Sequence, residues 1–192
     1  MKYVQEHTSQ TLEVKQSKFI AHLMPFTLFD EVLAGLKEEH PKARHFVVAW
    51  RYINEFDQIV EHCSDDGEPK GTSGRPSLAV LAGHGLINTA LVTVRYFGGT
   101  KLGTGGLVRA YSDACNLAVE HSRLLPYVKL EKHLFFVKYS DISLIEHRVE
   151  EHKLLLDTKS FDELGAMLSV RAEASQWEKF YKENGRLICI EE

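Results

Sequence analysis

The chain has 192 residues, of which 44% are hydrophobic and 26% are charged, and its formal net charge is −4 at pH 7. This composition is typical of a globular protein with a sizeable core. The negative balance excludes a protein that coats nucleic acid through overall positive charge, so any contact with RNA or DNA has to come from a local basic surface.

Along the first two thirds of the chain, β-branched and aromatic runs alternate with segments in which apolar residues recur at helical spacing. The runs predict strands and the helical spacing predicts helices. In chain order, the expected elements are a strand at 17–24, a helix over 27–40, strands at 44–53 and 58–63 joined by a hairpin loop at 54–57, a helix from Pro76 to about Ala82, a strand at 87–94 and a helix from Leu107. The glycine-rich segment at 98–106 therefore lies between a strand and a helix.

A domain boundary is expected after residue 125, because the pattern restarts beyond Pro126 as a separate small unit. Its expected elements are a strand at 132–139, a helix capped by Ser140 or Asp141, strands at 154–160 and 167–173, a helix opened by a capping box at 175–178 and ended by Asn184 and Gly185, and a strand at 187–190. This βαββαβ order predicts a ferredoxin-like domain. The fold class is α+β, with domains at 1–125 and 126–192.

Residues 77–94 carry no charge and approach the length of a membrane span. Gly83, His84, Gly85 and Asn88 interrupt the segment, so the pattern favours a helix, a turn and a buried strand, and predicts no membrane contact. The N-terminus lacks the apolar stretch of a secretory signal. The three cysteines are far apart and form no CxxC pair, which excludes a disulfide framework and a cysteine-based zinc site and indicates the cytoplasm.

The segment 95–109 holds five glycines and three cations, and no Asp or Glu lies between Glu68 and Asp113. Its spacing fits neither a P-loop nor a dinucleotide fingerprint, because the lysine is missing from its place and valine stands at 108. Glycines let backbone amides approach an anion, and the helix that follows offers its positive N-terminus. The alternative is that the glycines only permit a tight crossover while the cations are solvated.

Aromatic residues beside this segment offer stacking surfaces for RNA bases. Because neighbouring residues of a strand point to opposite faces, at most one of Tyr96 and Phe97 is expected to be exposed. The candidate RNA-binding or anion-binding residues are Lys70, Arg75, Arg95, Tyr96, Phe97, Gly98, Gly99, Lys101, Gly103, Gly105, Gly106 and Arg109.

The loop that precedes this segment carries three carboxylates, Asp65, Asp66 and Glu68. They could bind Mg²⁺ or act as acid and base in a metal-dependent hydrolase. The favoured interpretation is structural: the aspartates cap backbone amides and pair with Arg75 or Arg95. The sequence therefore predicts no catalytic residues, no metal and no cofactor.

Three segments, 64–69, 71–76 and 95–111, closely resemble the YigZ/IMPACT family in their order and spacing, over about residues 15–121. The tail from about residue 130 resembles the small C-terminal domain of bacterial members. The resemblance implies an N-terminal α/β sandwich of the ribosomal protein S5 domain 2-like class and a ferredoxin-like C-terminal domain. Both are similar to late domains of the translocating elongation factor, which contact ribosomal RNA.

Eukaryotic family members regulate translation by binding a protein that activates a kinase of an initiation factor. They carry a different extra domain, so that partner is not carried over. From the resemblance and the basic segment, we expect a translation-associated regulator that binds RNA or the ribosome through residues 95–109, and not an enzyme. The alternative is a protein-interaction regulator of translation or of a stress response that uses the same surface.

Overall fold

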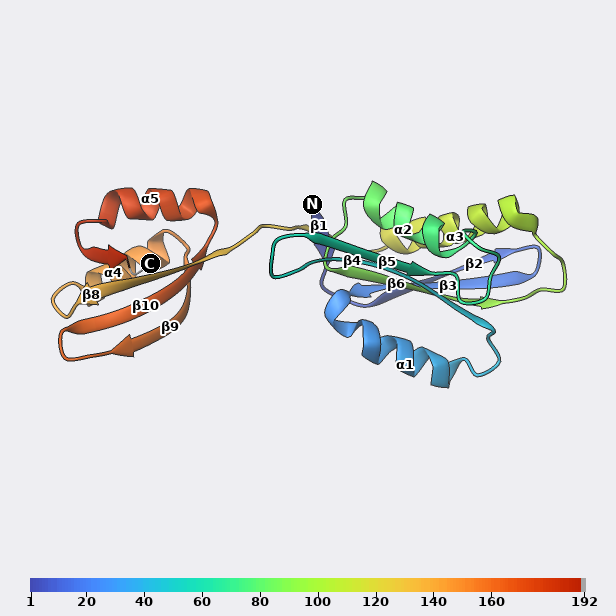
Figure 1. Ribbon diagram of the computed structural model, residues 1–192, viewed down its shortest axis with the longest axis horizontal. Coiled ribbons are helices and arrows are strands. Elements are labelled where there is room, and N and C mark those ends of the chain that lie inside the picture. Colours follow the sequence, from blue (N-terminus) through green and yellow to red (C-terminus); the bar gives the residue numbers. More distant parts are fainter. Residues whose placement is uncertain (191–192) are drawn as a thin grey trace. The chain divides into compact units, whose positions relative to one another are not determined.

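The computed structural model describes residues 1–190, and the chain divides into two compact units with a mixed α/β fold (Figure 1). The first unit comprises Met1–Tyr127 and the second begins at Val128. The boundary therefore lies two residues after the one expected from the sequence. The reason is that residues 124–126 form a strand of the first unit.

The N-terminal unit is built on an antiparallel sheet whose strands are β2 (Thr8–Val14), β3 (Ser17–Pro25), β4 (His45–Ile53), β5 (Ile59–Ser64) and β6 (Thr89–Tyr96). Their order across the sheet is β2-β3-β6-β4-β5. Every residue of the central strand β6 except Tyr96 is buried, in keeping with its β-branched sequence. The predicted hairpin between β4 and β5 is confirmed by the pairing of Ile53 with Ile59.

Helices cover both faces of this sheet (Figure 1). The helices are α1 (Phe29–Glu39), which follows a 3₁₀ turn at Phe26–Leu28, α2 (Gly74–Gly83) and α3 (Gly103–Glu120). One core, which includes Leu91 and Tyr111, lies under α2 and α3, and the other, which includes Val92 and Leu36, lies under α1. Leu91 and Val92 belong to different cores because successive strand residues point to opposite faces.

Two helices begin earlier than the sequence predicts. The first residue of α2 is Gly74, so Pro76 is its third residue and not its first. The first residue of α3 is Gly103, four positions before Leu107, so Gly105 and Gly106 lie in its first turn and not in a loop. The prediction was wrong here because glycine has a low helix propensity, which hid the true start of α3.

A separate two-stranded sheet joins β1 (Lys2–Val4) to β7 (Leu124–Pro126). Lys2 pairs with Pro126, and the side chain of Val4 is buried in the core under α2 and α3. The sequence predicts neither of these strands, because three residues are too few to show a periodicity. It also misses β2, an edge strand whose sequence, Thr-Ser-Gln-Thr-Leu-Glu-Val, is mostly polar.

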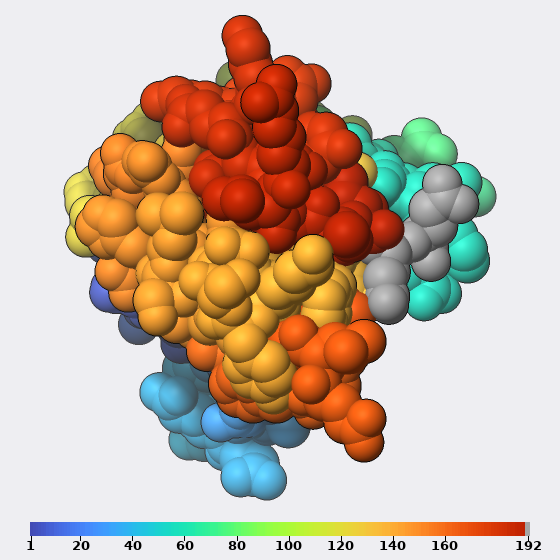
Figure 2. All heavy atoms as spheres, turned by 90° about the vertical axis from the view of Figure 1, so that its left-hand side faces the viewer, coloured from blue at the N-terminus to red at the C-terminus, as the bar shows by residue number. Residues whose placement is uncertain are grey.

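The second unit contains β8 (Glu131–Lys138), α4 (Ile142–Glu151), β9 (Leu155–Phe161), β10 (Gly165–Ala172), α5 (Ala174–Asn184) and β11 (Ile188–Ile190), in the expected βαββαβ order. The sheet is antiparallel, with strand order β11-β8-β10-β9. Ile145 of α4 and Phe180 of α5 share one core with Phe135 and Leu168, so both helices pack on the same face. Figure 2 shows the surface of this unit.

The capping box of α5 differs from the predicted one. Glu173 is the N-cap, and its backbone N–H donates to Oε1 of Gln176 at 3.1 Å. The box therefore begins two residues before Ser175. At the other end, Gly185 follows Asn184 as the C-cap, as predicted.

Candidate nucleic-acid interface

The glycine-rich turn connects β6 to α3 and lies against the hairpin between β2 and β3. The backbone N–H of Gly98 donates to Oγ of Ser17 at 3.1 Å. A Cβ atom on Gly98 would lie 2.0 Å from the carbonyl carbon of Gln16, so no side chain fits there. Gly99 and Gly103 have φ values of +89° and +73°, which glycine adopts at little cost. At these three positions, packing or backbone conformation explains the glycine.

The first turn of α3 is exposed and carries no negative charge. Its N-cap is Leu102, which makes no side-chain capping hydrogen bond, and no acidic residue lies in the first turn. The first N–H groups of a helix lack intrahelical partners and carry a partial positive charge. An anion at this end of α3 would therefore receive hydrogen bonds from the backbone.

Arg95, which the sequence predicts as an anion-binding residue, is instead buried in an ion pair. Its Nη1 donates to Oε1 of Glu68 at 2.5 Å, and the residue is 6% exposed. The hydroxyl of Tyr111 donates to the same carboxylate oxygen at 2.9 Å. Burial, followed by the negative charge of Glu68, raises the pKa of Tyr111, so this hydroxyl stays protonated. Arg95 is thus a structural residue that links β6 to the loop that carries Asp65, Asp66 and Glu68, which we call the acidic loop.

Four of the predicted cations remain exposed. Within residues 1–190, none of them forms an ion pair, which leaves their charges available to an anion. Lys101 lies directly before α3 and shares a pocket with the acidic loop. Arg109 lies farther along α3 and lines a hollow with Gly106 and Lys15. The four residues are Lys70, Arg75, Lys101 and Arg109.

Lys15 is an exposed cation beside Arg109 that the sequence interpretation missed. It lies in the turn between β2 and β3, with a φ of +46°. Because β2 itself was missed, nothing in the sequence indicated that this turn lies against α3.

The two aromatic residues of the segment have different environments. Tyr96 is partly buried on the α1 face, where its hydroxyl lies 3.0 Å from Nδ1 of His40. Phe97 is 55% exposed, and the guanidinium carbon of Arg95 lies 5.8 Å from its ring centre. Of the two rings, Phe97 is therefore the exposed one, whereas Tyr96 packs beside the core under α1, in agreement with the expectation that at most one of them is exposed.

A pocket of about 330 Å³ lies between the acidic loop and the start of α3. Its buried residues are Glu68, Arg95 and Leu107, and its more exposed lining residues are Pro69, Phe97, Lys101, Leu102, Gly103 and Thr104. The pocket thus combines apolar side chains with one exposed cation and the N-terminus of a helix.

The acidic loop is held by its own hydrogen bonds. Asp65 accepts bonds from the amides of Gly71, Ser73 and Gly74 and from the hydroxyl of Ser73. Burial raises the pKa of Asp65, but these bonds outweigh that effect and leave the pKa below its usual value.

The other two carboxylates of the loop are also engaged. Oδ2 of Asp66 accepts from the amide of Phe46 at 2.6 Å, and Glu68 holds Arg95. Across residues 1–190 there is no group of three or more side chains suited to hold a metal ion. The loop therefore matches the structural interpretation, with the correction that Glu68, and not an aspartate, pairs with Arg95.

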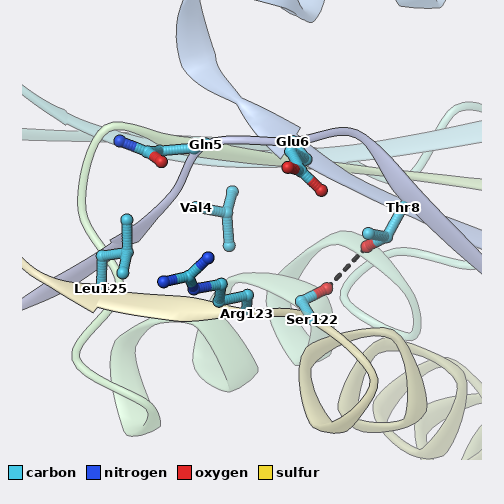
Figure 3. A pocket seen from close by; sticks show the side chains of 7 residues that line it. All are labelled: Val4, Gln5, Glu6, Thr8, Ser122, Arg123 and Leu125. Carbon is cyan, nitrogen blue, oxygen red and sulfur yellow. Dashed lines mark hydrogen bonds between the residues drawn. The ribbon is translucent and has the colours of Figure 1, made fainter.

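A second hollow, between β1 and the segment that follows α3, is much smaller (Figure 3). Its volume is about 20 Å³, which is room for about one water molecule. Oγ1 of Thr8 and Oγ of Ser122 lie 2.6 Å apart at its edge. This hollow holds no group of reactive side chains, and the pocket at α3 is the better candidate.

In the described part of the chain, no helix has the length and apolar character needed to cross a membrane.

The fold and the glycine-rich basic turn define a class of two-unit α/β proteins. The model of the Impact N-terminal domain matches residues 15–119. An IMPACT family member of Haemophilus influenzae is 34% identical over 185 residues, covering 92% of this chain and 89% of that protein. The IMPACT family member YigZ of Escherichia coli is 39% identical over 137 residues, covering 70% and 67%.

A crystal structure of a hypothetical protein is similar along nearly its whole length. Its TM-score is 0.71 at 28% identity, with 98% of this chain and 95% of that chain covered. The chain belongs to the IMPACT family, as the resemblance of residues 64–111 indicates.

Proposed function

We propose that this protein is a translation-associated regulator that binds RNA, at or near the ribosome in the cytoplasm, through the exposed first turn of α3. The proposal rests on the presence of a glycine, Gly105, at a helical position that does not require one. This residue is exposed, its φ is not positive, and a Cβ atom there would meet nothing within 4 Å. Neither packing nor conformation calls for glycine, which costs a helix about 1 kcal/mol relative to alanine. Close approach of a ligand to the backbone accounts for it.

The charges around this turn support an anionic ligand. Lys101 precedes the turn and Arg109 follows it, and neither is neutralised by a carboxylate of the described chain. The helix N-terminus adds a partial positive charge. A phosphate group placed there would gain both backbone hydrogen bonds and Coulomb attraction.

The fold supports a place in translation. The strand order of the second unit agrees with a ferredoxin-like sheet, and the antiparallel sheet of the first unit agrees with the ribosomal protein S5 domain 2-like class. The resemblance to the family implies both classes, and both are similar to late domains of the translocating elongation factor. These likenesses support the proposed RNA-binding role in translation.

The test is an anisotropy titration of a fluorescent single-stranded RNA against the full chain at several salt concentrations. The double variant Lys101→Glu/Arg109→Glu should bind at least tenfold more weakly. Its logarithmic salt slope should become shallower by about 1.4, since each lost phosphate contact removes about 0.7. The matched control is Lys37→Glu/Lys42→Glu, which changes two exposed lysines in and just after α1, on the opposite face of the sheet.

Equal losses in both double variants would contradict a local RNA site. Absence of binding to any nucleic acid at low salt would refute the RNA proposal. The surface would then be assigned to a protein partner. A pull-down in which the partner stays bound at high salt would detect it, because contacts to phosphates weaken with salt.

A further inference from the structure

The pocket beside α3 has a feature that its structural role does not explain. Arg95 is more than nine-tenths buried and lines the pocket, yet its Nε has no hydrogen-bond partner. Nη1 of this guanidinium donates to Glu68, and its carbon lies 5.3 Å from the ring centre of Phe19 and 5.8 Å from that of Phe97. Buried donors are nearly always satisfied, because an unpaired one loses its hydrogen bond to water and gains none in return. Nε itself is buried beneath the pocket surface, so a ligand in this pocket would be held by the side chains and the helix end that line it.

The lining of the pocket defines the chemistry of that ligand. Phe97 is an exposed ring at the edge of the pocket, and Pro69 and Leu107 add apolar surface. Lys101 and the first turn of α3 supply positive charge. A ligand that fits both parts has a planar aromatic ring, which can stack on Phe97, joined to an anion.

The size of the pocket sets the extent of the ligand. Its volume of about 330 Å³ is at the lower end of the range for small-molecule sites, about 300–1,000 Å³. This volume suits a single ring system and not a stack of several. A base in a duplex is paired and stacked between its neighbours, so only an unpaired base presents its face to an aromatic side chain.

We propose that this pocket takes one unstacked base of single-stranded RNA. The base lies against Phe97, and its phosphate lies at the N-terminus of α3 beside Lys101. The inference rests on the proposed function and adds a class of ligand to it: single-stranded RNA in preference to duplex.

The experiment compares two labelled ligands of equal length and charge, a short single-stranded RNA of mixed sequence and an abasic ribose-phosphate chain. The full chain should bind the RNA about tenfold more tightly, since stacking of one base on an aromatic side chain is worth a factor of that order. Phe97→Ala should remove this preference and leave the affinity for the abasic chain unchanged. The control is Phe56→Ala, another exposed phenylalanine, in the loop between β4 and β5.

A second variant keeps every charge and blocks the pocket. Thr104 is exposed in the first turn of α3 and lines the pocket, so Thr104→Trp should fill it. This variant should bind the RNA as weakly as the abasic chain. The thermal unfolding midpoint is measured for each variant, so that a folding defect is recognised.

The outcomes separate the two proposals. Equal affinity of the wild-type chain for RNA and for the abasic chain would overturn the base pocket and leave the phosphate site intact. Equal weakening of both ligands by Phe97→Ala would overturn it as well. Binding of neither ligand would refute the proposed function, and the base pocket with it.

Discussion

Glu68 and Arg95 form an ion pair inside the N-terminal unit, with Nη1 of Arg95 2.5 Å from Oε1 of Glu68; the side chain of Arg95 is 7% exposed and that of Glu68 is 3% exposed. The pair joins the acidic loop to the strand that precedes the glycine-rich turn. Two segments that look in the sequence like separate charged sites therefore neutralise each other in part. The cations that remain for a ligand are those outside the pair.

Loss of the Glu68 charge should destabilise the fold. Glu68→Gln leaves the buried guanidinium of Arg95 without its counter-ion, and we expect a loss of about 3–5 kcal/mol in the free energy of unfolding. The control is Glu61→Gln, which breaks the more exposed pair with Arg51 and should cost about 1 kcal/mol or less. Urea denaturation measures both, and similar losses would show that burial of the Glu68 pair is unimportant.

Two glycines of the same segment should respond in opposite ways to alanine. Gly98→Ala places a Cβ atom on the backbone of Gln16 and should cost about 3 kcal/mol or more. Gly105→Ala meets no neighbour and should stabilise the protein by about 0.5–1 kcal/mol, because alanine favours the helix. If Gly105 admits a phosphate, this more stable variant should bind RNA more weakly. A stable Gly105→Ala variant with unchanged RNA affinity would remove the main support for the proposed function.

The acidic loop should depend on Asp65 and not on a metal. Asp65→Ala leaves the amides of Gly71, Ser73 and Gly74 without their acceptor, and we expect a loss of about 1–2 kcal/mol. Asp113→Ala, at an exposed position of α3, should change stability by less than about 0.5 kcal/mol. Mg²⁺ should leave the unfolding midpoint of the wild-type chain unchanged. A midpoint that rises with Mg²⁺, and does so only when Asp65 is present, would favour the metal-dependent hydrolase.

Stability should fall in mild acid because of His22. Its Nδ1 lies 3.0 Å from Nε2 of His7, and burial, with the neighbouring His7 and His40, lowers its pKa to about 4. Between pH 6.5 and about 4, the unfolded chain binds a proton at this residue that the folded chain does not. The free energy of unfolding therefore decreases as the pH falls through this window, by at most about 3.5 kcal/mol, since one pKa unit corresponds to about 1.4 kcal/mol.

His22→Gln should flatten this pH dependence, and His62→Gln, at an exposed position of β5, should not. Denaturation midpoints at pH 7 and in mild acid provide the comparison. Glu39, whose carboxylate lies 3.9 Å from Nε2 of His40, belongs to the same cluster. Equal slopes for the wild-type chain and His22→Gln would assign the acid sensitivity to other groups.

The long elements of the fold were predictable because their side chains repeat with the period of the structure. In β6 an uncharged run up to Val94, rich in β-branched residues, marks a strand buried on both faces, and in α3 apolar and small residues recur on the side that faces the sheet. The strands β1 and β7 were not predictable. Their stability comes from pairing with each other across more than a hundred residues of chain, and no local pattern records that pairing.

The candidate site was predictable in its location but not in the roles of its residues. At most one of Tyr96 and Phe97 was expected to be exposed, and the structure shows that the exposed one is Phe97, directly after β6. The burial of Arg95 depends on Glu68, which lies 27 positions earlier and approaches it only after the loop folds back. The sequence left two interpretations of the glycines open, anion binding and a tight crossover. Packing in the crossover requires Gly98, whereas packing does not explain Gly105.

The ladder between β1 and β7 decides how the N-terminal unit can be isolated. The amide of Tyr127 donates to the carbonyl of Met1, and the amide of Lys2 donates to the carbonyl of Gly85. A recombinant fragment that ends at residue 125 would lose Pro126, which pairs with Lys2 in the β1–β7 sheet, and the hydrogen bond from Tyr127 to Met1. A fragment of residues 1–127 keeps both, and a purification tag attached to Met1 would lie beside the point where this unit ends.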